Sequence, residues 1–109
     1  IPLILYAKDS ANKLQELVSC GTTCLALDHS IDLAEAKKSL GSEISVQGNL
    51  DPTILLSDLE EIRRHVQFVL DQAEKRPGHI FNLGHGVLPQ TPVEHAVAVV
   101  ELVHELSQA

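Results

Sequence analysis

The sequence lacks several features that would define common protein classes. It has 109 residues and no methionine, so we expect a processed or excised part of a longer chain. No apolar run approaches the roughly 18 residues of a membrane-spanning helix. No basic and then apolar segment of the secretory kind begins the sequence. These absences predict no membrane partner.

Cysteines and basic residues are also scarce. The only two cysteines, Cys20 and Cys24, lie in one predicted turn, and such a pair in an intracellular α/β protein indicates reduced structural thiols. Eight Lys and Arg stand against fifteen Asp and Glu, giving a formal charge of -7. That balance disfavours nucleic acid as a partner. Neither Cys-x-x-Cys nor His-Glu-x-x-His spacing occurs, and we expect no metal site.

What the sequence does contain is a fourfold alternation of apolar and amphipathic segments. Strands are predicted at residues 2–7, 24–28, 44–47 and 79–83, and helical spacing of apolar residues follows each of them. Strand and helix in this order imply right-handed crossovers and a parallel sheet. We therefore predict one α/β domain over residues 1–109, made of four consecutive parallel βα units.

Two of the predicted helices begin with recognisable capping patterns. Ser57 and Glu60 have the spacing of a capping box. Thr91, Pro92 and Glu94 have the order expected of a cap, a first-turn proline and a glutamate at the third helical position.

Four βα units form an arc that cannot close on itself. A complete eight-stranded barrel needs about 250 residues, and an open arc leaves unpaired backbone groups on both outer strands. Either the remainder of a barrel covers these edges, or the chain is a non-catalytic module that self-associates or docks with a separate N-terminal half.

Polar residues follow every predicted strand, where parallel βα folds carry their active sites. The candidates for an active-site rim are Lys8, Asp28, Gln47, Asn49, Asn82 and His85. His85 lies between Gly84 and Gly86, which allow a sharp bend and a close approach to a ligand. An imidazole can bind a carboxylate or relay a proton near neutral pH, or it can simply fix its own loop through a backbone carbonyl.

Two motifs, Val46-Gln47-Gly48-Asn49-Leu50-Asp51-Pro52 and Asn82-Leu83-Gly84-His85-Gly86, resemble the uroporphyrinogen decarboxylase family. Ala7-Lys8-Asp9 and Leu25-Ala26-Leu27-Asp28 are also similar to segments of that family, so the resemblance extends over the whole chain. It implies the C-terminal half of a (β/α)8 TIM barrel. It also implies a cofactor-free lyase that removes CO2 from the four acetate side chains of uroporphyrinogen, giving coproporphyrinogen in heme and chlorophyll biosynthesis.

The resemblance assigns a substrate contact to His85 and places the family's arginines and pyrrole-anchoring aspartate in an N-terminal part. Because uroporphyrinogen carries eight carboxylates, we expect its charge to be met mostly outside these residues, and the chain alone to be inactive. The family also implies a homodimer in the cytoplasm, or in the plastid of a plant. The family commonly has tryptophan where this sequence has His29.

The other rim candidates keep two interpretations each. Asn49 and Asn82 either contact a ligand or hold their turns, and Asp28 either orients a neighbour or makes a turn. Gln47 either lies behind the contacting residues and supports them or has no part in the site. Lys8 either meets a carboxylate or pairs with Asp9. A weaker alternative for the whole protein is a cobalamin-linked methyltransferase relative, a class that holds zinc with histidine and cysteine.

Overall fold

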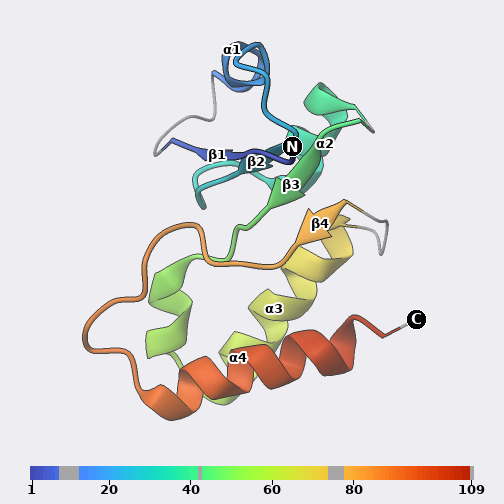
Figure 1. Cartoon of the computed structure of the whole chain (residues 1–109). Coiled ribbons are helices and arrows are strands. Elements are labelled where there is room, and N and C mark those ends of the chain that lie inside the picture. Colours follow the sequence, from blue (N-terminus) through green and yellow to red (C-terminus); the bar gives the residue numbers. More distant parts are fainter. Residues whose placement is uncertain (8–12, 42, 74–77, 109) are drawn as a thin grey trace.

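The computed structural model describes residues 1–7, 13–41, 43–73 and 78–108. Its strands are β1 (Ile4–Tyr6), β2 (Cys24–Ala26), β3 (Ser45–Gln47) and β4 (His79–Ile80). They form one sheet in the order β1-β2-β3-β4, and every neighbouring pair is parallel (Figure 1). This confirms the predicted α/β class and the consecutive parallel βα units.

The strands are shorter than the apolar segments that predicted them. The fourth segment pairs with β3 only through β4, whose residues His79 and Ile80 lie opposite Val46 and Gln47. It then meets the extension of β3 once more, at a parallel bridge between Leu50 and Leu83. The prediction of a continuous strand over residues 79–83 was therefore too long.

The helices are α1 (Leu14–Val18), α2 (Leu33–Leu40), α3 (Leu59–Ala73) and α4 (Val93–Leu106). An additional 3₁₀ helix, η1 (Pro52–Leu56), was not predicted. Its start has a clear physical cause: the Asp51 carboxylate accepts a hydrogen bond from Thr53 N at 2.9 Å, and proline occupies the first position. Among the described residues, no helix is long and apolar enough to cross a membrane.

The predicted starts of α3 and α4 are displaced by one residue. Helix α3 is capped by Asp58, whose carboxylate accepts from Glu61 N at 2.9 Å, and not by Ser57. Ser57 instead ends η1. Helix α4 begins after Pro92, which is extended (ψ 137°) and occupies the cap position that we assigned to Thr91.

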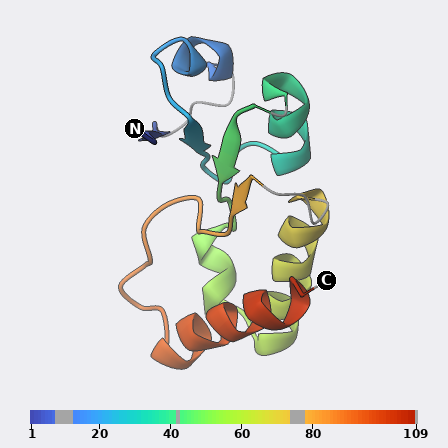
Figure 2. The ribbon, with the colours of Figure 1, turned by 45° about the vertical axis from the view of Figure 1, so that its right-hand side comes forward.

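Packing on the helix side of the sheet forms one continuous core. The strand register places Leu5, Leu25 and Val46 in a row, and the last two are fully buried. They pack with fully buried side chains of the helices, such as Ile62 and Val66. Consecutive helices contact each other in chain order, α1 with α2, α2 with α3 and α3 with α4 (Figures 1 and 2).

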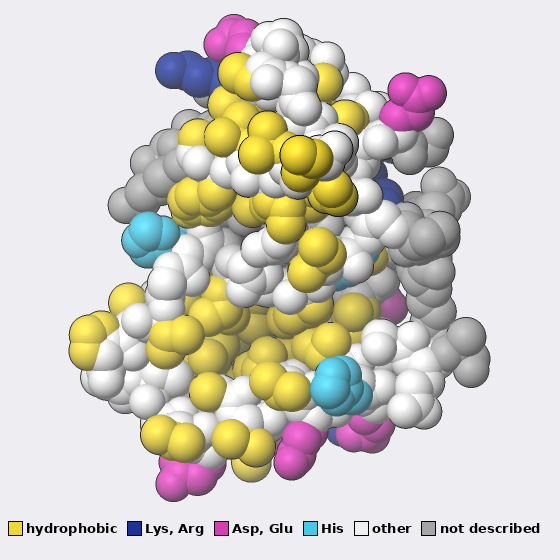
Figure 3. Space-filling model, viewed as in Figure 1, with side chains coloured by type: hydrophobic (Ala, Val, Ile, Leu, Met, Phe, Trp, Pro, Cys, Tyr) yellow, Lys and Arg dark blue, Asp and Glu magenta, His cyan; other side chains and the backbone are white. Residues whose placement is uncertain are grey.

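The opposite face of the sheet is much less covered. Tyr6, Ala26, Gln47 and Ile80 form a row on it, because residues alternate between the two faces of a strand. At the two outer strands this face is open, since Tyr6 is 40% and Ile80 48% exposed. Figure 3 shows hydrophobic side chains gathered on the side of the molecule that carries β1, and in the hollow above α4. Apolar side chains on an open sheet face need a covering partner.

Candidate active site at the strand ends

A cavity of about 240 Å³ lies at the C-terminal ends of the strands. All four strand-end segments contribute to its wall: Tyr6 from β1; Asp28, His29 and Ser30 after β2; Asp51, Pro52 and Thr53 after β3; Gly84, His85 and Leu88 after β4. The loops that follow β2, β3 and β4 therefore meet here beside the last residue of β1. This is the position of active sites in βα folds.

The loop after β4 reaches this cavity by crossing the ends of the other strands (Figures 1 and 2). Gly84 N donates to Leu50 O, beyond β3, at 2.7 Å. The Tyr6 hydroxyl, on β1, donates to Gly84 O at 2.9 Å. A Cβ atom on Gly84 would lie 2.4 Å from His29 N, beyond β2. Segments from β1, β2 and β3 thus fix the residue that precedes His85.

His85 lines the cavity and is exposed to solvent. Its ring is stacked on that of Tyr6, with 6.4 Å between centroids and 24° between planes. His85 Nδ1 lies 3.3 Å from the Tyr6 hydroxyl oxygen.

Asp28 and Asn49 are both buried and both hold the loop that follows β2. The Asp28 carboxylate accepts from Ser30 N at 3.0 Å and also from the Ser30 hydroxyl. The Asn49 side-chain amide donates to Asp28 O at 2.9 Å and to Ile31 O. Contacts of this kind are expected of residues that stabilise a turn, which was one of the two interpretations of Asp28 and Asn49. Asp28 also borders the cavity.

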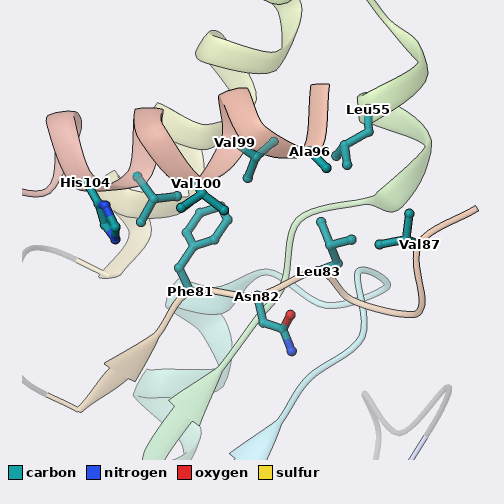
Figure 4. Close-up of a pocket in the computed structure, with 10 residues that line it drawn as sticks. Leu55, Phe81, Asn82, Leu83, Val87, Ala96, Val99, Val100 and His104 are labelled. Atoms are coloured by element: carbon teal, nitrogen blue, oxygen red, sulfur yellow. The ribbon is translucent and has the colours of Figure 1, made fainter. Parts of the chain in front are cut away.

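Neither Asn82 nor Gln47 borders this cavity. Asn82 lines a different hollow of about 330 Å³ between the end of β4, η1 and α4 (Figure 4). That hollow is mostly apolar and is bordered by Phe81 and by Val99 and Val100 of α4. Gln47 is half-buried in the row of residues on the open sheet face and does not border the strand-end cavity. Lys8 lies outside the described residues.

Two ionisable side chains of the cavity, those of Tyr6 and Asp51, were not among our candidates. Burial by itself would raise the pKa of Asp51, but hydrogen bonds from Thr53 and the nearby imidazoles of His29 and His65 bring the pKa below its usual value. Asp51 is therefore a carboxylate at neutral pH. The position of Asp51 in the turn after the third strand was the available signal, whereas Tyr6 lies inside a predicted strand and gave none.

The cavity wall offers hydrogen-bonding groups and acidic groups but no cationic side chain among its described residues. Two imidazoles, a phenol and two carboxylates border it. Within the described part of the chain, no group of three or more His, Cys, Asp or Glu residues could hold a metal ion. The arrangement suits hydrogen bonding and proton exchange with a polar ligand.

Comparisons with known proteins agree with this geometry. A solved structure, a methyltransferase from Methanosarcina mazei, superimposes on 98% of this chain and 32% of its own, with a TM-score of 0.82 and 21% sequence identity. At that identity the likeness concerns the fold alone.

The sequence comparisons are more specific. The uroporphyrinogen decarboxylase of Geobacter sulfurreducens is 46% identical over 107 residues, covering 98% of this chain and 32% of the relative. That of Pseudomonas fluorescens is 43% identical and is covered to 30%. The chain thus spans about a third of the length of these relatives. The family model "Uroporphyrinogen decarboxylase (URO-D)" matches residues 1–106, and this chain accordingly belongs to the uroporphyrinogen decarboxylase family.

Proposed function

We propose that this chain is the C-terminal half-barrel of a uroporphyrinogen decarboxylase. The complete protein would remove CO2 from the four acetate groups of uroporphyrinogen to give coproporphyrinogen, without a cofactor. Support comes from the family match over residues 1–106 and from the cavity to which all four strand ends contribute. We further propose a homodimer in the cytoplasm, or in the plastid if the source is a plant.

Within that enzyme, His85 is the residue that we assign to the substrate. It is exposed at the cavity, and its backbone is fixed by Gly84 and the neighbouring strand ends. An imidazole in this position can bind an acetate carboxylate or move a proton. The described wall contributes carboxylates and no Lys or Arg, so we expect most of the cations that meet the substrate's charge to come from the remainder of the barrel.

The role of His85 is tested by His85→Ala in the complete enzyme. A hydrogen bond to a charged group contributes roughly 1.5–3 kcal/mol, so we expect kcat/KM for CO2 release to fall about 10- to 100-fold. His104→Ala is the matched control, because His104 is exposed on α4 and does not border the strand-end cavity. Equal activity of the two variants would remove His85 from the site.

The 109-residue chain alone is expected to show no turnover in the same assay, because the described cavity has no cationic side chains for an octacarboxylate. Normal turnover by the isolated chain would contradict the proposal that the cationic side chains of the site come from the remainder of the barrel.

The weaker methyltransferase alternative has only the shared fold of the structural neighbour from Methanosarcina mazei behind it. Metal analysis of the complete protein separates the two functions. Stoichiometric zinc together with absence of CO2 release would favour the methyltransferase, and CO2 release without bound zinc would favour the decarboxylase.

A further inference from the structure

Tyr6 is the residue whose contacts determine how His85 presents its ring. Its hydroxyl oxygen lies 2.9 Å from Gly84 O and 3.3 Å from His85 Nδ1. The two rings are also stacked. The residue before His85 and the His85 ring are therefore both held by one side chain of β1.

The chemistry of these atoms fixes the direction of the contact with Gly84 and favours one direction for the contact with His85. A carbonyl oxygen can only accept, so the single hydroxyl proton of Tyr6 is donated to Gly84 O. The Tyr6 oxygen still has lone pairs and can accept from His85 Nδ1–H. The reverse direction would withdraw the proton from the shorter contact and deprive the Gly84 carbonyl of this donor.

We propose that Tyr6 is a positioning residue that keeps neutral His85 protonated on Nδ1 and leaves Nε2 as the nitrogen that serves the ligand. A neutral imidazole carries one proton, and the hydrogen bond at one nitrogen sets which nitrogen holds it. Nε2 then accepts from an N–H or a protonated carboxyl group, and after taking up a proton it donates to a carboxylate. The identity of that ligand rests on the proposed function, whereas the tautomer does not.

Tyr6→Phe isolates the hydroxyl, because the phenyl ring retains the stacking surface. In water, neutral histidine side chains carry their proton mainly on Nε2. Without the Tyr6 hydroxyl we therefore expect His85 to change from mainly Nδ1–H to mainly Nε2–H. Histidine-selective ¹⁵N labelling of the complete protein, at a pH where His85 is neutral, reads this directly, and His85→Gln identifies the resonances.

Two other histidines provide internal references. His79 Nε2 lies 2.7 Å from Gly48 O and must be protonated there, since the partner is a carbonyl. His95 Nδ1 lies 2.6 Å from Leu55 O and gives the opposite tautomer. Unchanged His79 and His95 signals in Tyr6→Phe establish that the fold is retained.

The outcomes are separable from those of the proposed function. Nδ1–H in the parent and Nε2–H in Tyr6→Phe support the positioning role, with or without enzymatic activity. The same His85 tautomer in both proteins overturns it. Because the spectra are recorded without substrate, failure of the decarboxylase assay bears on the proposed function alone.

Discussion

At the strand-end site, Gly84 occupies a position that has no room for a side chain. An added Cβ would lie 2.4 Å from His29 N and 2.9 Å from His29 Cβ, so either the backbone after β2 or the loop itself must move. Gly84→Ala should lower the free energy of unfolding by roughly 1–3 kcal/mol, the usual cost of overpacking. Urea unfolding of the two proteins measures it.

Gly86→Ala is the matched control for this substitution. It adds the same methyl group two residues later, where nothing lies within 4 Å of the new atom. We expect a change within about 0.5 kcal/mol. Equal destabilisation by the two substitutions would mean that the contact with His29 does not constrain the loop.

The sequence identified His85 and its glycines but not the residues that hold them. Glycines around a polar residue after an apolar segment are a local signal, readable within a few positions. The contact of Tyr6 with Gly84 joins residues 78 positions apart, and an apolar segment containing Tyr6 predicts a strand and nothing more. Asn82 and Gln47 were assigned to the active-site rim because they lie at predicted strand ends. That position does not specify where a side chain points.

Among the elements, β4 depends on the side chain of His79. Burial lowers the pKa of His79 from 6.5; the hydrogen bond to Gly48 O opposes the shift, and Lys37 adds to it. The folded state therefore takes up a proton less readily than the unfolded state. The stability contributed by neutral His79 is complete above about pH 6.5 and is lost as the pH falls through its lower folded-state pKa.

Below pH 6.5, the free energy of unfolding should decrease with a His79 contribution of up to about 1.4 kcal/mol per pH unit. His79→Gln removes this titration, so its stability should depend less on pH between about 7.5 and 5.5 than that of the parent. Urea unfolding at several pH values compares the slopes. His104→Gln, on the exposed part of α4, should keep the parent slope. An unchanged slope in His79→Gln would show that another group is responsible.

At this scale the order and type of the predicted strands and helices were right, and several of their ends were wrong. Apolar periodicity extends over many residues and specifies a strand or a helix robustly. A helix start depends on one hydrogen bond, and Ser57 and Asp58 are both good caps separated by one position. Which of the two residues caps α3 is decided by the backbone conformation. Ser57 ends η1, so Asp58 is the cap of α3.

Across the whole molecule, the open sheet face predicts association of the isolated chain. Ile4 is 52% exposed on β1, on the face that the helices do not cover. We expect sedimentation of the 109-residue chain to show concentration-dependent mass above 11.9 kDa.

Ile4→Lys should shift this equilibrium toward the monomer by placing a charge on the open face. Leu59→Lys is the matched control, since Leu59 is 54% exposed at the start of α3 on the helix side, and it should associate like the parent. A monomer at every concentration, or equal effects of the two lysines, would contradict an apolar association surface.

The bond between Tyr6 and Gly84 also has a kinetic consequence. Joining residues 78 positions apart closes a long loop, whose entropic cost is recovered only when the intervening elements are already in place. We therefore expect the His85 imidazole to be oriented late in folding, after the last strand has docked beside the third. Before that step, most of the helices would be formed while the His85 ring is not yet held by Tyr6.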